Sequence, residues 1–125
     1  MAREVISTDS IAPSAGPFSA AVRGHGLIYL SGLVAQDPAT DTLVSGDIEV
    51  QTERVLLNIK AVLEAAGKTL DDVIRVGVYL TDMSTFSAMN AVYERHFVPP
   101  YPARTTICVV ALPLGAAVEM DAVVG

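Results

Sequence analysis

The segment from Asp47 to Gly67 constrains the fold of this chain most strongly. Apolar residues recur in it at helical spacing, which places them on one side of a helix. Asp47 is suited to cap the first turn that begins at Ile48, and Gly67 can adopt the left-handed conformation that ends a helix. The apolar stripe consists of Val55, Leu56, Ile59, Val62, Leu63 and Ala66. We therefore predict an amphipathic helix between Asp47 and Gly67 that covers one side of a core.

Strand-like segments lie on both sides of this helix in the sequence. Residues 20–31 have two β-rich halves around Gly24-His25-Gly26, and glycine supplies the positive φ angles that a tight hairpin turn needs. Residues 36–46 are rich in turn formers and predict a loop. The other predicted strands are residues 73–80, 104–111 and 117–124, the last two separated by a turn around Pro113 and Gly115, with a short additional strand near residues 3–7.

A second helix is predicted to begin near Ser84 and to end before Pro99 and Pro100. Its inward side is expected to consist of Phe86, Met89, Tyr93 and Phe97. The resulting order is β-β-α-β-α-β-β, an α+β fold in a single domain over residues 1–125. The simplest two-layer arrangement is one β-sheet with two helices packed on one face. The opposite face of the sheet is then left uncovered by the chain itself.

Composition indicates that an oligomer buries this uncovered face. Of the 125 residues 51% are hydrophobic and 18% are charged, against a usual charged share of about 25%. A chain this small leaves a large fraction of its surface exposed, and soluble monomers rarely expose large apolar patches. We predict a permanent oligomer, and the alternative is an unusually apolar monomer.

Charge and cysteine content argue against several classes of partner. The net charge is −6, and the eight lysines and arginines are scattered singly, so we expect no nucleic-acid partner. We expect no membrane partner either, because no run of 18 residues is apolar. The single Cys108 excludes an internal disulfide, and no Cys or His pairs have the spacing of a zinc site. We expect a cytoplasmic protein without a bound metal.

Two polar residues stand where a ligand could bind. Asn90 falls within the stripe of the second helix, either as a core amide bonded to a loop backbone or as part of a site. Arg104 begins a strand and shares one face with Thr106 and Cys108. An arginine at a strand end is most often solvated, but its planar guanidinium is the best side chain for holding a carboxylate with two hydrogen bonds.

The last predicted strand carries two carboxylates on one face, Glu119 and Asp121. They fit simple alternation toward solvent, or one of them could orient a hydrolytic water near a carboxylate-binding arginine. His25, in the hairpin turn, and His96, at the end of the second helix, are expected to be exposed rather than catalytic. Cys108 is expected to be a small packed residue rather than a nucleophile.

Five segments together resemble the motifs of the RidA/YjgF family. They are YPARTT at 101–106, similar to (F/Y)PAR(S/T); GPF at 16–18, similar to GPY; YLSG at 29–32, similar to a strand ending in SG; NAVY at 90–93, similar to NxxY; and LP at 112–113 with VEMDA at 118–122, similar to LP…(V/I)E(I/M)(E/D)A. The motifs cover nearly the whole chain in the order of the family, and the chain is identified as a member on that ground.

The resemblance implies a chorismate-mutase-like fold and a homotrimer in which the sheets form a central barrel. Three sites would lie in the clefts between subunits. Family members resembling this chain hydrolyse 2-aminoacrylate and related imines, released by pyridoxal-phosphate enzymes, to 2-keto acids and ammonia without a cofactor or metal. The partner implied is a small carboxylate-bearing imine or enamine.

Residue by residue, the resemblance implies that Arg104 holds the substrate carboxylate and that Glu119 positions and helps to activate the attacking water. Ser31 and Asn90 would supply polar contacts, and Gly32 would allow a close approach of the chain. An imine carbon is already electrophilic, so orientation, a placed water and a proton shuttle are what its hydrolysis requires.

Two residues of the expected substrate site depart from the family pattern. Phe18 replaces the usual tyrosine after Gly-Pro, and Thr106 replaces the usual cysteine after the arginine, a position that Cys108 does not fill. The reaction class is expected to survive these changes, whereas the substrate does not follow from the sequence. Two alternatives stay open: a dedicated catabolic deaminase, acting for example on 2-aminomuconate, and a non-catalytic ligand-binding or holdase-like trimer.

Overall fold

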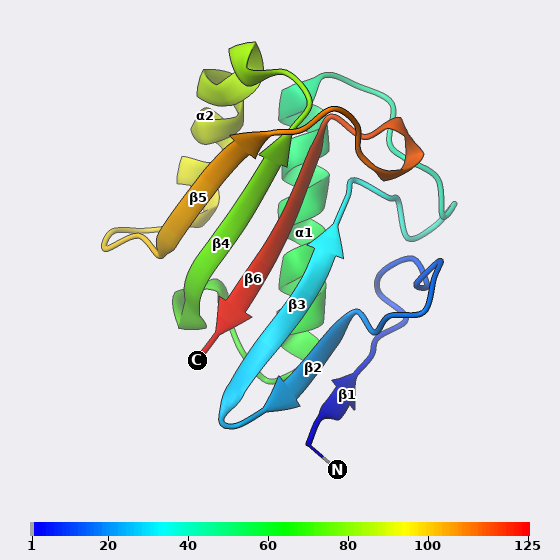
Figure 1. Cartoon of the computed structure of the whole chain (residues 1–125), viewed down its shortest axis with the longest axis vertical. Coiled ribbons are helices and arrows are strands. Elements are labelled where there is room, and N and C mark those ends of the chain that lie inside the picture. Colours follow the sequence, from blue (N-terminus) through cyan, green and yellow to red (C-terminus); the bar gives the residue numbers. More distant parts are fainter. Residues whose placement is uncertain (1) are drawn as a thin grey trace.

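The computed structural model describes residues 2–125, which form one six-stranded sheet with two helices on one face (Figure 1). The strands are β1 (Glu4–Ile6), β2 (Ala21–Gly24), β3 (Leu27–Leu33), β4 (Val73–Leu80), β5 (Ala103–Cys108) and β6 (Val118–Val124). Their order in the sheet is β1-β2-β3-β6-β4-β5, and only β4 and β5 pair in parallel. The predicted mixed sheet with both helices on one face is confirmed.

Helix α1 (Ile48–Ala65) has the predicted ends and the predicted buried side. The carboxylate of Asp47 accepts a hydrogen bond of 3.1 Å from the backbone N–H of Val50, and Gly67 follows the helix with a φ of 72°. Five members of the apolar stripe are at most 1% exposed: Val55, Leu56, Ile59, Val62 and Leu63. They pack against the sheet, chiefly against β6 and β3. Burial of this stripe therefore supplies much of the hydrophobic stabilisation.

The hairpin of β2 and β3 also follows the sequence pattern. Gly24 pairs with Leu27, so the turn consists of His25 and Gly26, with φ angles of 54° and 79°. Such a two-residue turn with positive φ at both positions matches the twist of the flanking strands. His25 is exposed, as expected.

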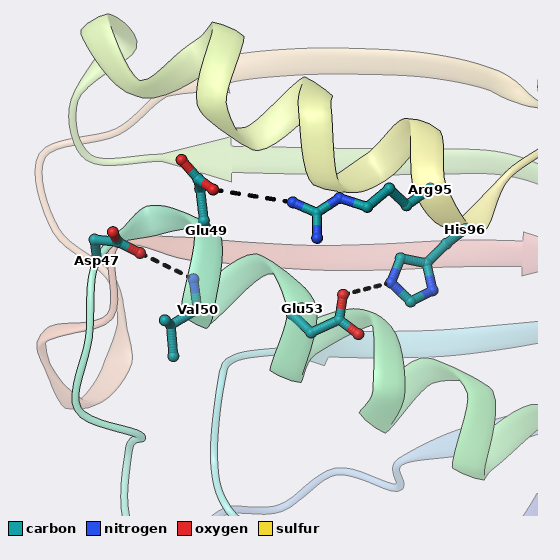
Figure 2. A network of polar contacts seen from close by, with 6 residues as sticks. All are labelled: Asp47, Glu49, Val50, Glu53, Arg95 and His96. Carbon is teal, nitrogen blue, oxygen red and sulfur yellow. Dashed lines mark hydrogen bonds and ion pairs between the residues drawn. The ribbon is translucent and has the colours of Figure 1, made fainter.

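Helix α2 (Phe86–His96) follows a short 3-10 turn (Met83–Thr85) and connects β4 to β5. Two polar contacts join it to α1, as Figure 2 shows. Nε2 of His96 lies 2.7 Å from Oε1 of Glu53, and the guanidinium of Arg95 lies 3.9 Å from the carboxylate of Glu49. His96 was predicted to be exposed, and this is wrong, because the contact with α1 leaves its side chain only 9% exposed.

Two other burial predictions and one predicted strand end fail near strand β5. Phe86 is 36% exposed rather than inward-facing, because it is the first residue of α2, and Val92 is buried within the helix instead. Cys108 is exposed rather than packed, since it is the last residue of an edge strand. The strand ends at Cys108 rather than at residue 111, and Val110 beyond it is fully exposed.

The face of the sheet opposite the helices is uncovered, as the topology predicted (Figure 1). Large apolar side chains are exposed on it: Val5 on β1 is 58% exposed, Tyr29 on β3 45% and Ile107 on β5 44%. Their strand partners place all three on the same side of the sheet as Glu119. Among residues 2–125 no helix is both long and apolar enough to cross a membrane.

Candidate active site

Glu119 lies on the uncovered face of the sheet, near its centre. Along β6, Val118 and Met120 are buried under the helices, whereas Glu119 and Asp121 alternate to the other side. Tyr79 on β4 is the residue directly opposite Glu119. The predicted shared face of the two carboxylates is therefore present, in the middle of the sheet rather than at its edge.

Gly32 on β3 lies against the Glu119 side chain. A Cβ atom at residue 32 would be 2.7 Å from Oε2 of Glu119 and 2.8 Å from its carboxyl carbon. The pairing of β3 with β6 is irregular between Leu30 and Leu33, where Gly32 falls. Any side chain at residue 32 would displace the carboxyl of Glu119 from this position. The close approach expected at Gly32 is thus an approach to Glu119.

A cavity of about 470 Å³ adjoins Glu119, Ser31 and Gly32. Most of its wall is apolar and comes from the segment before β2, from β3 and from the turn before β6. The apolar wall includes Ile11, Pro13, Phe18, Leu33, Pro113 and Leu114. The hydroxyl of Ser31 donates a hydrogen bond of 2.7 Å to the carbonyl of Ser19, so it is already partnered in the single chain. The structure therefore brings together four of the predicted site residues: Phe18, Ser31, Gly32 and Glu119.

The carboxyl of Glu119 has an increased affinity for a proton. Burial raises the pKa of Glu119, and the negative charge of Asp121 raises it further. Within residues 2–125 the Glu119 carboxylate takes part in no hydrogen bond and no ion pair. A carboxyl with these properties can exchange a proton with a bound water more readily than an ordinary surface glutamate.

Arg104 lies on the other face of the sheet, beside α2. The carbon of its guanidinium is 4.7 Å from the centre of the Tyr93 ring and 5.6 Å from that of Phe86. Contacts of this kind favour a cation over the face of an aromatic ring. The side chain is half-buried and makes no ion pair within the part of the chain that the structure describes. Its guanidinium is thus held in place with its charge not neutralised by a carboxylate of the same chain.

Two buried hydroxyls lie on the same side of the sheet as Arg104. Oγ1 of Thr106 is buried without a hydrogen-bond partner in residues 2–125, and the Tyr93 hydroxyl is buried close to the Arg104 guanidinium. Burial raises the pKa of the Tyr93 phenol, and the positive charge of Arg104 opposes this shift. A buried hydroxyl without a partner costs about 1–3 kcal/mol. These groups are consequently favourable places for polar atoms from outside the chain.

The sheet register separates Arg104 from Glu119 within one chain. Arg104 pairs with Val76, which pairs in turn with Ala122, and both partners are buried under the helices. Glu119 pairs with Tyr79 on the opposite face. Neither Arg104, Thr106 nor Asn90 lines the cavity beside Glu119. A single chain therefore presents two separate groups of predicted site residues.

Asn90 is not a core amide bonded to a loop backbone, which was one of its two interpretations. Another amide, on α1, has that structural role. Asn90 is only half-buried, and no hydrogen bond of its side chain occurs within the described residues. Two amides of α1 are buried, Gln51 and Asn58. The NH₂ group of Asn58, 2% exposed, donates to the carbonyls of Val34 and Gln36 at 3.2 and 3.0 Å. Asn58 holds the chain that leaves β3, and this role was not predicted from the sequence, although Asn58 directly precedes the stripe residue Ile59.

A polar cluster beside Glu119 was not predicted from the sequence. The carboxylate of Asp121 accepts hydrogen bonds from the backbone N–H of Gly77 at 3.1 Å and from the hydroxyl of Tyr79 at 2.8 Å. Arg75 lies 3.9 Å from the same carboxylate. The hydrogen bond to Asp121 is the main cause that raises the pKa of Tyr79, so this phenol remains a donor. The register of β4 against β6 creates the cluster, and that register is not visible in either strand alone.

Comparisons with known proteins agree with the fold and with the motifs. The sequence model of the family described as endoribonuclease L-PSP matches residues 9–125. A RutC family protein of Pyrococcus abyssi is 44% identical over 123 residues, which cover 98% of this chain and 97% of that protein. A protein of Capra hircus named 2-iminobutanoate/2-iminopropanoate deaminase is 39% identical over 123 residues, 98% of this chain and 90% of that protein.

A solved structure of a Rid-family protein of unknown function from Yersinia pestis superposes with a TM-score of 0.96. It is 40% identical and the alignment covers 99% of each chain. The sheet, the helices and the motifs thus define an α+β protein of the L-PSP type. The chain belongs to the RidA/YjgF family, whose members include proteins named imine deaminases.

Proposed function

We propose that this protein is a hydrolytic deaminase of small reactive imines and enamines that carry a carboxylate, such as 2-aminoacrylate and 2-iminopropanoate. The observation that carries the proposal is the carboxyl of Glu119, which has a raised pKa, no partner in the described chain and a mostly apolar cavity beside it. The relative from Capra hircus, named for 2-imino acids, supports the same reaction class.

Glu119 is assigned to the water that attacks the imine carbon. Its carboxylate accepts a proton from the water as the oxygen bonds to carbon, and the protonated carboxyl then delivers that proton to nitrogen. In the resulting carbinolamine the hydroxyl proton then passes to nitrogen through the same carboxyl, so that the carbon–nitrogen bond breaks and ammonia and a 2-keto acid are released. The carboxyl needs a proton affinity above that of an ordinary glutamate for both transfers, which agrees with its raised pKa.

Arg104 is assigned to the substrate carboxylate. Its guanidinium is held over the rings of Tyr93 and Phe86 and lacks a carboxylate partner within residues 2–125, so an anion from solution meets no intramolecular competitor. Two parallel hydrogen bonds from the guanidinium fork would fix the orientation of a planar imino acid. The Thr106 hydroxyl, buried without a partner among the described residues, and the half-buried Asn90 lie on the same side of the sheet and are assigned to further polar contacts.

A complete site on these assignments needs two copies of the chain, because Arg104 and Glu119 lie on opposite faces of one sheet. We assign the oligomer as a homotrimer of ~39 kDa, three times the 13.1 kDa chain, with sites between subunits. Apolar side chains exposed on the uncovered sheet face support burial of that face in the assembly. Light scattering that finds a stable monomer at micromolar concentration would remove the shared site.

The name of the matching family model refers to RNA cleavage, and the charge of this chain does not favour that activity. Fourteen acidic residues outnumber eight basic ones, and the resulting net charge is −6. Affinity for the phosphate backbone depends on clusters of lysine and arginine. We therefore retain the imine as the proposed substrate.

The decisive experiment measures ammonia release from 2-aminoacrylate generated in situ, above the rate without protein. Arg104→Ala and Glu119→Gln are each expected to keep only a small residual activity when assayed alone. When the two variants are unfolded and refolded together, mixed sites form that take Arg104 from one variant and Glu119 from the other. Random mixing restores about one quarter of the wild-type activity, because each of two positions is intact with a probability of one half.

The outcomes separate the parts of the proposal. If both variants keep only residual activity and mixing restores nothing more, the two residues act within one chain, and the shared site is wrong. If the wild type releases no ammonia above the background but binds 2-keto acids, the protein is a binding protein rather than an enzyme. If Glu119→Gln alone keeps full activity, Glu119 is not the group that activates water.

A further inference from the structure

The polar cluster beside Glu119 points to a function for Asp121, which none of the motifs or comparisons assigns. Tyr79 stands directly opposite Glu119 across β4 and β6, a position from which a tyrosine hydroxyl could donate to that carboxylate. Its hydroxyl donates instead to Asp121, at 2.8 Å. The hydroxyl of the residue opposite Glu119 in the sheet register thus bonds to Asp121 and not to Glu119.

The other hydrogen-bond donors on this part of the uncovered face also lie near the Asp121 carboxylate. It accepts from the backbone N–H of Gly77 at 3.1 Å and has Arg75 at 3.9 Å. A Cβ atom at residue 77 would collide with Oδ1 of Asp121, so a glycine is required for the carboxylate to lie over β4. Two hydrogen bonds and a nearby cation fix the position of the Asp121 carboxylate, whereas the Glu119 oxygens have no hydrogen-bond partner in residues 2–125.

We propose that Asp121 is a positioning residue for the deaminase reaction: it holds the Tyr79 hydroxyl away from Glu119 and fixes a negative charge beside it, which leaves Glu119 a free carboxyl to bind and deprotonate water. The role of Asp121 in the reaction rests on the proposed function, whereas its electrostatic effect on the Glu119 carboxyl does not. Residues two apart on a strand are separated by about 7 Å, close enough for charge to act across a partly buried face. The raised pKa of Glu119, caused by burial and then by Asp121, agrees with this arrangement.

The charged and titratable groups on this face are few. Asp121 lies on β6 itself, and Tyr79 and Arg75 lie on the neighbouring β4. Tyr29 lies further along β3 opposite Val123, and Arg3 lines a hollow beside it. Apart from Glu119, the residues that line the adjoining cavity include no titratable side chain among those described. A change of charge at residue 121 therefore acts on Glu119 with little compensation from other groups.

The test follows the titration of the Glu119 carboxyl by ¹³C NMR in the intact assembly, with its signal assigned through Glu119→Gln. Asp121→Asn keeps the size of the side chain and removes its charge, so the titration midpoint of Glu119 is expected to fall by about half a pH unit or more. The acid limb of the pH profile of kcat/KM is expected to move to lower pH by the same amount. Asp82→Asn is the matched control, since Asp82 also accepts a backbone hydrogen bond, from Ser84, and should leave both readouts unchanged.

Two further variants keep the inference testable even if Asp121→Asn does not fold. Arg75→Gln removes the cation near Asp121 and should raise the midpoint of Glu119, a shift of opposite sign. Adding Tyr79→Phe to Asp121→Asn should raise the Glu119 midpoint part of the way back. The reason is that Asp121→Asn frees the Tyr79 hydroxyl to donate to Glu119, and Tyr79→Phe removes that hydroxyl. An unchanged Glu119 midpoint in Asp121→Asn, or in Arg75→Gln where the first variant does not fold, overturns the proposal. Because NMR needs no substrate, that result is distinct from a failure of the protein to hydrolyse imines.

Discussion

Gly32→Ala tests whether the approach of β3 to Glu119 matters for turnover. The carboxyl carbon of Glu119 would lie 2.8 Å from the new methyl group, whereas carbon atoms in contact prefer about 3.5–4.0 Å. The carboxyl must therefore move by about 0.7 Å or more. Misplacement of a catalytic group by about 1 Å can cost on the order of 100-fold in rate, so we expect kcat/KM to fall between about tenfold and 100-fold.

Stability is expected to change little in the same variant. Gly32 does not have a positive φ angle, so alanine is compatible with its backbone conformation. Replacing such a glycine stabilises a protein by about 0.4–1 kcal/mol through the unfolded state. Moving the flexible end of Glu119 away from its preferred rotamer costs about 0.5–1.5 kcal/mol. The two effects nearly cancel, and thermal unfolding should show a change of about 1 kcal/mol or less.

The assay compares kcat/KM for 2-aminoacrylate in four proteins: wild type, Gly32→Ala, Glu119→Gln and the double variant. If Gly32→Ala acts through Glu119, it should change the residual activity of Glu119→Gln by less than about twofold. Gly24→Ala on β2 is the control, because its Cβ would meet only the backbone oxygen of Ala2, at 3.1 Å. Full activity in Gly32→Ala would refute the reasoning. So would a double variant whose kcat/KM lies as far below that of Glu119→Gln as Gly32→Ala lies below the wild type.

Three other variants probe the site. Arg104→Lys keeps the charge but loses the planar fork, and steady-state kinetics should show kcat/KM reduced at least tenfold, about 1.4 kcal/mol. Phe18→Tyr restores the family hydroxyl, and competition between imines should show an equal or higher rate on a small 2-imino acid; a lower rate on a bulkier native substrate would mark a shifted specificity. Glu119→Gln should gain stability over the wild type as pH rises. The raised pKa of Glu119 means that its contribution to stability is full below the ordinary glutamate value of about 4.3 and is lost as pH rises through the higher value of the folded state. Thermal unfolding from about pH 4 to pH 8 should show this difference growing, and a constant difference would contradict it.

Local patterns predicted the parts of the fold that depend on nearby residues. The Asp47 cap, the α1 stripe, the turn at His25 and Gly26 and the alternation along β6 each arise within a few residues, so their geometry is encoded locally. The incorrect predictions concern contacts between elements or the residues at which elements begin and end. His96 is covered by α1 through Glu53, and Phe86 remains exposed because α2 begins at that residue.

The position of the predicted site residues depended on pairings that no single segment contains. Arg104 and Glu119 were expected in one site, and both lie on strands with the predicted alternation. Only the parallel pairing of β5 with β4 and the antiparallel pairing of β6 with β4 place them on opposite faces. The Asp121–Tyr79 hydrogen bond has the same origin, since its partners are 42 residues apart in the sequence.

The aromatic support of Arg104 bears on how tightly an anion can be held. A free arginine side chain has about 2 kcal/mol of rotamer entropy that ordering removes. In this chain the guanidinium already lies 4.7 Å from the Tyr93 ring, so much of that freedom is given up when α2 folds onto the sheet. An incoming carboxylate then meets a preorganised cation and loses less affinity to side-chain ordering. Removing the ring with Tyr93→Leu should weaken anion binding chiefly through an unfavourable entropy, which calorimetry can measure directly.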